Sequence, residues 1–142
     1  MRVEEIMTKN PACCMPDTKL SEVAQMMADR DVGQIPVVDH VSRKPVGVVT
    51  DRDITLRAIA KGRNPLGMTV REVMSSPAVT ITPDARIEDA CRTLEDRQVR
   101  RMPVVAKDGS CCGMISQADI AQHAPERMTA EVVRKVSQPW RP

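Results

Sequence analysis

An eight-residue stretch occurs twice in this sequence, and this repeat limits the folds that the chain can adopt. The first copy is Gly47–Ile54 (GVVTDRDI) and the second, 66 residues later, is Gly113–Ile120 (GMISQADI). Each copy runs from a glycine through apolar residues to a hydroxyl, and an aspartate follows three residues after that hydroxyl. This pattern predicts a buried strand that ends at Thr50 or Ser116 and leads directly into a helix.

The sequence around the two copies repeats as well. Residues 3–7 (VEEIM) correspond to residues 70–74 (VREVM), and a hydroxyl and a proline follow in both cases. Two tandem units of similar length explain this spacing. We therefore expect a first repeat over residues 1–62, a linker over 63–69, a second repeat over 70–124, and a C-terminal helix and tail over 125–142.

Apolar residues at helical spacing predict one amphipathic helix early in each repeat. Four apolar side chains stand at positions i, i+3, i+4 and i+7 in both copies, a spacing that puts them on one face of a helix. These residues are Leu20, Val23, Ala24 and Met27 in the first repeat, and Ile87, Ala90, Cys91 and Leu94 in the second.

The remaining apolar runs predict strands. Val32–Val38 and Val99–Val105 each contain Pro-Val-Val, which indicates a short buried strand entered through a proline. Ala12–Met15 and Ala78–Thr82 are expected to form the first strand of each repeat. Each repeat then has the order strand–helix–strand–strand–helix, which is an α+β fold.

Composition excludes several classes of protein. The net charge is +2 and Trp140 is the only aromatic residue, so the chain lacks the set of aromatic side chains on which bases stack, and we expect no nucleic-acid partner. No apolar run of about 18 residues is present, so no membrane span or membrane partner is expected. The first residues lack the apolar region of a signal peptide, so we expect a cytoplasmic protein.

The five cysteines allow two interpretations. Cys13-Cys14 and Cys111-Cys112 are adjacent pairs in or beside predicted strands, where neighbouring side chains point to opposite faces. They can serve as small buried hydrophobic residues. Alternatively, the two pairs can meet and form a zinc or redox site.

Catalysis finds little support in the sequence. Only His40 and His123 are present, and their spacing suggests no Ser–His–Asp or His–carboxylate grouping. We therefore expect no catalytic residue, no metal ligand and no enzymatic activity.

The tandem Gly-x-x-(Thr/Ser)-x-x-Asp turns, the Pro-Val-Val strands and the Met-Thr and Met-Ser segments resemble the CBS-domain pair, also called the Bateman module. The resemblance covers residues 3–123 and is closest to the small stand-alone members of that family. It implies tandem repeats packed about a pseudo-twofold axis, adenosine nucleotides in the clefts between them, and a homodimer.

The resemblance also implies a set of nucleotide-binding residues. In this family Asp53 and Asp119 match ribose-binding positions, and Thr50 and Ser116 match hydroxyls on the phosphate side. Base contacts come largely from backbone segments. The full candidate set is Thr8, Asn10, Ala12, Cys13, Gly33, Gln34, Ile35, Pro36, Thr50, Arg52, Asp53, Ser76, Ala78, Val79, Arg100, Arg101, Met102, Pro103, Ser116 and Asp119.

The two copies are not expected to bind equally. Arg52 adds a cation beside the first turn, so Asp53 is expected to matter more than Asp119. The pair Arg100-Arg101 stands where the first repeat has Gly33-Gln34, and an arginine fork suits a phosphate. The plainer interpretation is that the turns are ordinary helix caps and the arginines are surface charges.

These inferences predict a non-enzymatic sensor module that binds an adenosine nucleotide as a regulatory ligand. AMP is the first choice, with ATP, ADP, NAD or another adenosyl compound as alternatives. Two other functions remain open: a zinc- or thiol-redox-linked protein that binds no nucleotide, and a structural dimer whose clefts stay empty.

Overall fold

The computed structural model describes residues 1–139 and has the α+β fold that the repeats predict. Trp140, Arg141 and Pro142, which end the predicted tail, lie outside the described residues. The chain forms two compact units. Of the described residues, unit 1 contains 1–10, 79–108 and 112–139, and unit 2 contains 11–78 and 109–111. The compact units therefore differ from the sequence repeats, because residues 1–10 belong with the second repeat.

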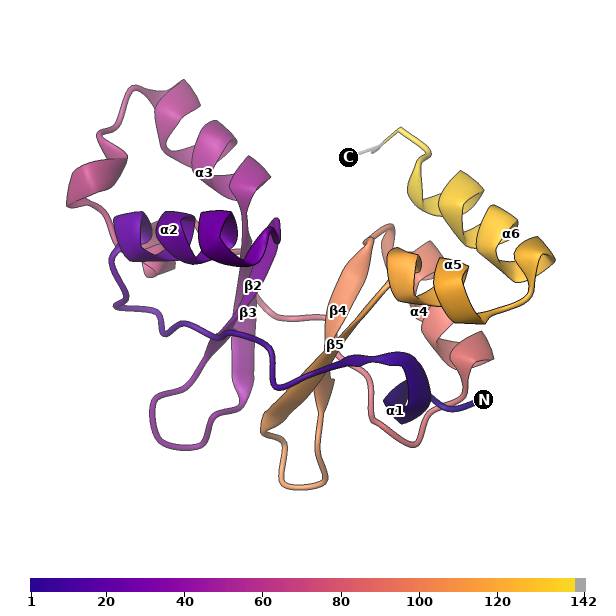
Figure 1. Ribbon diagram of the computed structural model, residues 1–142. Coiled ribbons are helices and arrows are strands. Elements are labelled where there is room, and N and C mark those ends of the chain that lie inside the picture. The colour runs from indigo at the N-terminus through magenta and orange to yellow at the C-terminus, as the bar shows by residue number, and fades with distance from the viewer. Residues whose placement is uncertain (140–142) are drawn as a thin grey trace. The chain divides into compact units, whose positions relative to one another are not determined.

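Unit 2 is built on an antiparallel hairpin of two strands, β2 and β3 (Figure 1). Gln34 lies opposite Thr50, so the hairpin places the start of β2 beside the end of β3. The elements of this unit are α2 (Leu20–Arg30), β2 (Gln34–Val38), β3 (Pro45–Thr50), α3 (Asp51–Arg57) and the 3-10 turns η1 (Ile59–Lys61), η2 (Pro65–Gly67) and η3 (Val70–Glu72).

The core of unit 2 is aliphatic, as the composition predicts. Leu20 and Val23 of α2 are at most 1% exposed, and they belong to one buried cluster with Ile35 and Val49 of the hairpin. Ala24 departs from the predicted apolar stripe, since it is exposed on the side of α2 that faces η2 and α3. The apolar face of α2 is therefore wider than the surface that the hairpin covers.

Unit 1 contains a three-stranded sheet of order β1-β5-β4. Thr8 lies opposite Met114 and Lys9 opposite Gly113, so the leading segment of the chain adds an edge strand to the second repeat. The elements are α1 (Val3–Ile6), β1 (Thr8–Lys9), α4 (Ile87–Arg97), β4 (Arg101–Val105), β5 (Cys111–Ser116), α5 (Gln117–His123) and α6 (Glu126–Val136).

The core of unit 1 confirms the predicted face of α4. All four residues of that face are buried, namely Ile87, Ala90, Cys91 and Leu94. The last helix, α6, also packs on this core through Val132 and Val136, whereas Val133 is 42% exposed. Its role as a cover for the core is consistent with its amphipathic pattern.

The predicted first strands of the repeats, Ala12–Met15 and Ala78–Thr82, are wrong. Each is reduced to one bridge, between Cys14 and Val37 and between Ile81 and Val104. At the first bridge Cys14 N donates to Pro36 O at 3.0 Å, and Val38 N donates to Cys14 O at 2.8 Å. Prolines flank both segments, at positions 11, 16, 77 and 83. Because proline has no N–H, longer ladders cannot form there.

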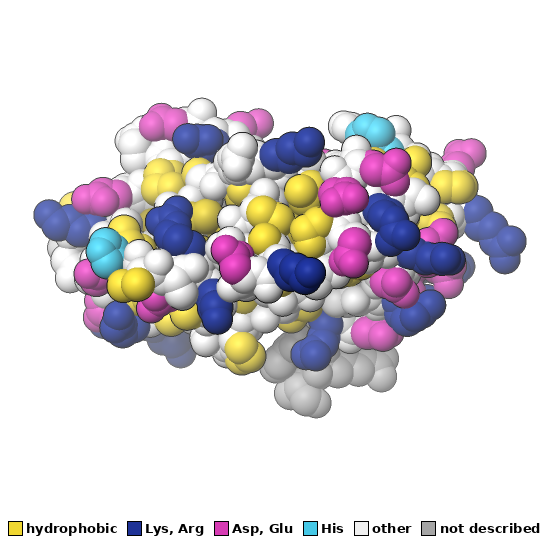
Figure 2. Space-filling model, turned by 90° about the horizontal axis from the view of Figure 1, so that it is seen from below, with side chains coloured by type: hydrophobic (Ala, Val, Ile, Leu, Met, Phe, Trp, Pro, Cys, Tyr) yellow, Lys and Arg dark blue, Asp and Glu magenta, His cyan; other side chains and the backbone are white. Residues whose placement is uncertain are grey.

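No helix within residues 1–139 has the length and hydropathy that a membrane crossing requires. Figure 2 shows one face of the molecule, on which Lys and Arg side chains alternate with Asp and Glu side chains. That face therefore carries no large patch of a single charge sign. A nucleic-acid interface usually carries a large basic patch.

Candidate functional site

The turn at Thr50 joins β3 to α3 through reciprocal hydrogen bonds. Asp53 N donates to Thr50 Oγ1 at 3.0 Å, and Thr50 N donates to Asp53 Oδ2 at 3.0 Å. This capping box follows from the local sequence, since a hydroxyl at the cap and a carboxylate three residues later satisfy each other's backbone N–H groups. The box holds the Asp53 carboxylate at the end of the strand.

The carboxylate of Asp53 has two further neighbours in unit 2. Ser75 Oγ donates to Asp53 Oδ1 at 3.3 Å, and Arg57 Nε lies 3.9 Å from the same oxygen. The Asp53 side chain is 13% exposed. Both oxygens are therefore engaged, yet the group stays accessible at the surface.

The glycine at the start of the first copy allows a close backbone approach, as its position suggests. Val48 N donates to Ser75 O at 2.9 Å and Ser75 N donates to Val48 O at 2.8 Å. A Cβ atom at Gly47 would lie 2.5 Å from Ser75 O. A side chain at Gly47 would thus push away the segment that brings Ser75 to Asp53.

The turn at Ser116 repeats this geometry in unit 1. Asp119 N donates to Ser116 Oγ at 3.2 Å, and Ser116 N donates to Asp119 Oδ2 at 2.9 Å. The residue that corresponds to Ser75 in the other repeat is Thr8, and a Cβ at Gly113 would lie 3.0 Å from Thr8 O. Within residues 1–139, however, no side-chain hydrogen bond joins Thr8 to Asp119, and Asp119 Oδ1 has no protein partner.

The structure divides the candidate residues between the two units. Those in unit 2 surround the β2–β3 hairpin, where Asp51 N donates to Gly33 O at 3.0 Å and links the two segments. Ser76 Oγ donates to Val46 O at 2.9 Å. The candidates in unit 2 are Ala12, Cys13, Gly33, Gln34, Ile35, Pro36, Thr50, Arg52, Asp53, Ser76 and Ala78.

The candidates of unit 1 surround β4 and β5 in the same way. Gln117 N donates to Arg100 O at 2.8 Å, which matches the bond between Asp51 and Gly33 in the other unit. The candidates in unit 1 are Thr8, Asn10, Val79, Arg100, Arg101, Met102, Pro103, Ser116 and Asp119.

Several candidate side chains are too deeply buried to meet a ligand directly. Ile35 and Met102 are 1% and 0% exposed, and Pro36 and Pro103 are also buried. Only the backbone of these residues can therefore contribute to a binding surface, and base recognition by main-chain groups stays a prediction.

The arginines predicted to read a phosphate are available for a ligand. Arg52 and Arg100 are exposed, and Arg101, the first residue of β4, is partly exposed. Among the described residues, none of these three guanidinium groups forms an ion pair or a hydrogen bond. Their charge is therefore not neutralised by any of the described residues.

The cysteines differ sharply in their electrostatic surroundings. A hydrogen bond from Cys111 and the nearby Arg43 charge lower the pKa of Cys13 to about 7, although partial burial opposes this change. Burial raises the pKa of Cys14 to about 12 and that of Cys91 to about 11. Sequence reasoning identified the two cysteine pairs but missed Arg43, because nothing local marks it as a neighbour of Cys13.

Sequence reasoning also missed Ser75 as a partner of Asp53. The signal was present, since Ser75 occupies the position that Thr8 holds in the first repeat, and Thr8 was a candidate.

Within residues 1–139, no group of three or more His, Cys, Asp or Glu side chains is placed to hold a metal ion.

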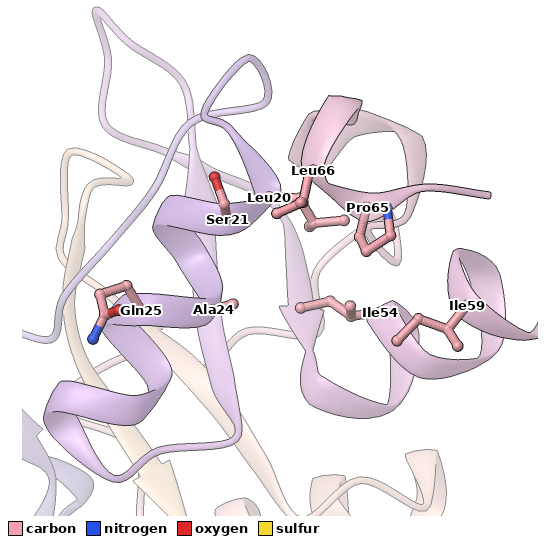
Figure 3. A pocket seen from close by; sticks show the side chains of 8 residues that line it. All are labelled: Leu20, Ser21, Ala24, Gln25, Ile54, Ile59, Pro65 and Leu66. Carbon is pink, nitrogen blue, oxygen red and sulfur yellow. The ribbon is translucent and has the colours of Figure 1, made fainter.

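A hollow of about 410 Å³ opens in unit 2 beside α2, α3 and the turns η1 and η2. Figure 3 shows apolar side chains that converge on it, whereas Gln25 points away. The lining contains no titratable group; it consists of Leu20, Ser21, Ala24, Gln25, Ile54, Ile59, Pro65 and Leu66. The hollow suits an apolar contact rather than chemistry.

Residues 3–59 and 70–126 each match the CBS domain family. The CBS domain-containing protein YhcV of Bacillus subtilis is 38% identical over 120 residues, which covers 84% of this chain and 82% of the relative. An uncharacterized protein of Methanopyrus kandleri is 28% identical over 123 residues, and this match spans 62% of that relative's length.

Hypoxic response protein 1 of Mycobacterium tuberculosis is 30% identical over 135 residues, covering 95% of this chain and 93% of the relative. The predicted likeness to the small stand-alone members of the family is thereby confirmed. Its crystal structure with two coordinated zinc ions has a TM-score of 0.78 to this chain at 30% identity, covering 88% of this chain and 100% of that one. The crystal structure of CBSX2 in complex with AMP has a TM-score of 0.73 at 26% identity, covering 87% of this chain and 95% of that one.

Proposed function

Because the chain belongs to the CBS-domain family and carries two CBS domains in tandem, we propose that it is a non-enzymatic sensor of an adenosine nucleotide. AMP is the ligand that we place first, with ADP, ATP, NAD and other adenosyl compounds as alternatives. The observation that carries the proposal is the pair of capping boxes, which hold Asp53 and Asp119 in the same position in both units.

The ribose is assigned to the two aspartates. A carboxylate accepts two hydrogen bonds from a pair of vicinal hydroxyls, and it needs a fixed orientation to do so. The capping boxes supply that orientation without occupying every acceptor site of the carboxylate. At Asp53 the hydroxyl of Ser75 lies beside the carboxylate, where it can accept a bond from the ribose while donating to Asp53.

In each unit the phosphate is assigned to an arginine of that same unit, Arg52 in unit 2 and Arg101 in unit 1. Both guanidinium groups lack a protein partner within residues 1–139, so binding an anion breaks no existing ion pair. A charge-assisted bond to phosphate is about twice as strong as a neutral one. We place the tighter site at the Thr50 turn, because Arg52 stands next to it in sequence.

Calorimetric titration of AMP into the full chain tests this proposal. Asp53→Ala should weaken AMP binding by about 1.5–3 kcal/mol, since a charged hydrogen-bond acceptor is lost. Asp119→Ala should weaken binding less, and Asp96→Ala, on the exposed face of α4, should leave it unchanged. A larger loss from Asp119→Ala than from Asp53→Ala would overturn the ranking of the two turns.

A panel of AMP, ADP, ATP, NAD, S-adenosylmethionine and Zn²⁺ in a thermal-shift assay separates the alternatives. A ligand that binds only the folded protein raises its stability in proportion to the logarithm of its concentration. If no adenosyl compound raises the melting temperature but Zn²⁺ does, the proposal fails in favour of a metal-linked protein. If nothing in the panel raises it, the chain is a structural module.

We further propose that two copies associate through the apolar hollow of unit 2. Ile59 and Leu66 at its rim are 58% and 75% exposed, and large exposed apolar side chains that cluster indicate a contact surface. Light scattering should give a dimer for the wild type and a monomer for Leu66→Lys. The matched control is Val41→Lys, because Val41 is 87% exposed in a loop away from the hollow.

A further inference from the structure

Unit 2 brings together two cysteines that are far apart in the sequence. Cys13 follows the leading segment of the chain, and Cys111 is the first residue of β5. Their side chains form a hydrogen bond, and Cys13 Sγ also lies 3.4 Å from Pro11 O. Both residues are only partly buried, so small molecules can reach them.

The loop between β2 and β3 places a cation beside these thiols. Asp39 Oδ2 accepts hydrogen bonds from Val41 N and Ser42 N, and Asp39 O accepts one from Arg43 N at 3.0 Å. Arg43 O in turn accepts a bond from Cys111 N at 3.1 Å. Arg43 is thus tied to the same backbone that carries Cys111.

The groups around Cys13 favour its thiolate. The Cys111 thiol donates to it, and the Arg43 charge attracts it, so the pKa of Cys13 falls to about 7. The neighbouring Cys14 does not compete, because its burial raises its pKa to about 12. At neutral pH about half of the Cys13 side chains are therefore ionised, and the thiolate is the reactive form of cysteine.

The other members of the two cysteine pairs point elsewhere. Cys14 is 4% exposed in the core of unit 2, and both its backbone N–H and its carbonyl oxygen form hydrogen bonds with β2. Cys112 Sγ donates to Val104 O at 3.5 Å and packs against the core of unit 1. Each adjacent pair therefore contributes one thiol to the contact and provides one matched control.

We propose that Cys13 and Cys111 are an oxidation site at which a hydroperoxide is reduced and an intramolecular disulfide is formed. In the first step the Cys13 thiolate attacks one peroxide oxygen, the O–O bond breaks, and the leaving alkoxide or hydroxide takes a proton from water. Cys13 is now a sulfenic acid. In the second step Cys111 sulfur attacks Cys13 sulfur, the S–O bond breaks, and the hydroxide leaves with the Cys111 proton as water. Two thiols and one hydroperoxide thus give one disulfide, one alcohol or water, and one further water.

The geometry makes this disulfide feasible and gives it a measurable consequence. The two sulfur atoms are already in hydrogen-bond contact, so rotation of the side chains can bring them to bonding distance. The new bond closes a long loop of the chain, which restricts the unfolded state more than the folded one. The oxidised protein should therefore melt about 10 °C above the reduced protein.

The test uses the full chain, reduced and then treated with hydrogen peroxide. Free thiols are blocked with iodoacetamide, and the protein is digested with trypsin for mass spectrometry. Peptides 10–19 and 108–127 should appear as one disulfide-linked species that is two hydrogens lighter than their sum. Cys13→Ser and Cys111→Ser should each abolish that species, whereas Cys14→Ala and Cys112→Ala should retain it.

The rate of oxidation provides a second readout that does not depend on folding of the cysteine variants. Arg43→Gln should slow the loss of thiols at pH 7 about twofold, because the thiolate fraction of Cys13 falls when the attraction of the Arg43 charge is lost. Nucleotide affinity is not the readout here, since the backbone of Cys13 also belongs to the proposed ligand-binding surface.

Three results would overturn the proposal. The first is a linked species that survives in Cys13→Ser. The second is a disulfide that joins two copies of the chain in non-reducing electrophoresis. The third is stoichiometric zinc in the reduced wild type that disappears in both Cys13→Ser and Cys111→Ser, which would make the thiols metal ligands.

Discussion

The turns at Thr50 and Ser116 have the same local geometry but different surroundings. In both, the aspartate three residues after the hydroxyl completes a capping box with bonds of 2.9 to 3.2 Å. Within residues 1–139, Asp53 accepts a further bond from a distant serine, Ser75, and lies near an arginine, whereas Asp119 has neither neighbour. A repeated motif therefore forms the same hydrogen bonds within itself in both repeats. Its partners outside the motif depend on which other segment of the chain the fold places beside it.

The first prediction uses one cysteine from each unit. Cys13 in unit 2 should react with iodoacetamide at pH 7 at least about a hundredfold faster than Cys91 in unit 1, because the pKa of Cys13 is about 7 and that of Cys91 about 11. The pKa of Cys13 is lowered, so its labelling falls as pH falls: from pH 7 to pH 5 the thiolate fraction drops about fiftyfold. Mass spectrometry of the labelled peptides measures both rates, and equal rates would contradict this difference between the units.

The second prediction compares the two glycines. Gly47→Ala should lower the free energy of unfolding by about 2–3 kcal/mol, because the new Cβ meets the Ser75 backbone oxygen at 2.5 Å. Gly113→Ala should cost only about 1 kcal/mol, since the nearest atom, at 2.6 Å, is the sulfur of the flexible Met7 side chain. Urea denaturation of both variants gives the two values. A larger loss for Gly113→Ala would mean that β1 is held more rigidly than the segment at Ser75.

The third prediction compares the corresponding positions Arg101 and Gln34. Arg101→Ala should weaken AMP binding by about 1–3 kcal/mol and leave adenosine binding nearly unchanged, because only AMP carries a phosphate. Gln34→Ala should change neither value by more than about 0.5 kcal/mol. Calorimetry with both ligands at two salt concentrations provides the measurement, and added salt should reduce the AMP affinity of the wild type more than that of Arg101→Ala. If Arg101→Ala weakened the binding of adenosine and AMP equally, the Arg101 side chain would shape the site and its charge would not recognise the phosphate.

The smallest expected effect is the coupling between Ser75 and Asp53. A double-mutant cycle with Ser75→Ala and Asp53→Asn should give a coupling of about 1 kcal/mol in the free energy of unfolding. The matched cycle with Thr8→Ala and Asp119→Asn should give a value near zero, since no side-chain bond joins those two residues within residues 1–139. A coupling of similar size in both cycles would show that the two turns are equivalent in solution.

Much of the secondary structure could be predicted from the sequence, for reasons that are local. The buried face of α4 follows from apolar residues at helical spacing, and the turns at Thr50 and Ser116 follow from a hydroxyl and an aspartate three residues apart. The strand predictions for residues 12–15 and 78–82 were wrong, because the prolines that flank each segment prevent a longer ladder of hydrogen bonds despite the apolar residues within it. The prediction that Ala24 lies on the buried face of α2 was wrong, because the hairpin covers only part of the apolar stripe of that helix.

The sequence by itself determined the two repeats, the family and the capping boxes, because each depends on residues close together in the chain. Only the tertiary structure decided that residues 1–10 join the second repeat, that Ser75 reaches Asp53, and that Cys13 meets Cys111. Those contacts depend on which strand edges are left open and on which glycines let a backbone approach. A contact between two residues far apart in the chain leaves no periodic pattern in the sequence around either residue. It can therefore be identified only from the positions of the strands in the folded chain.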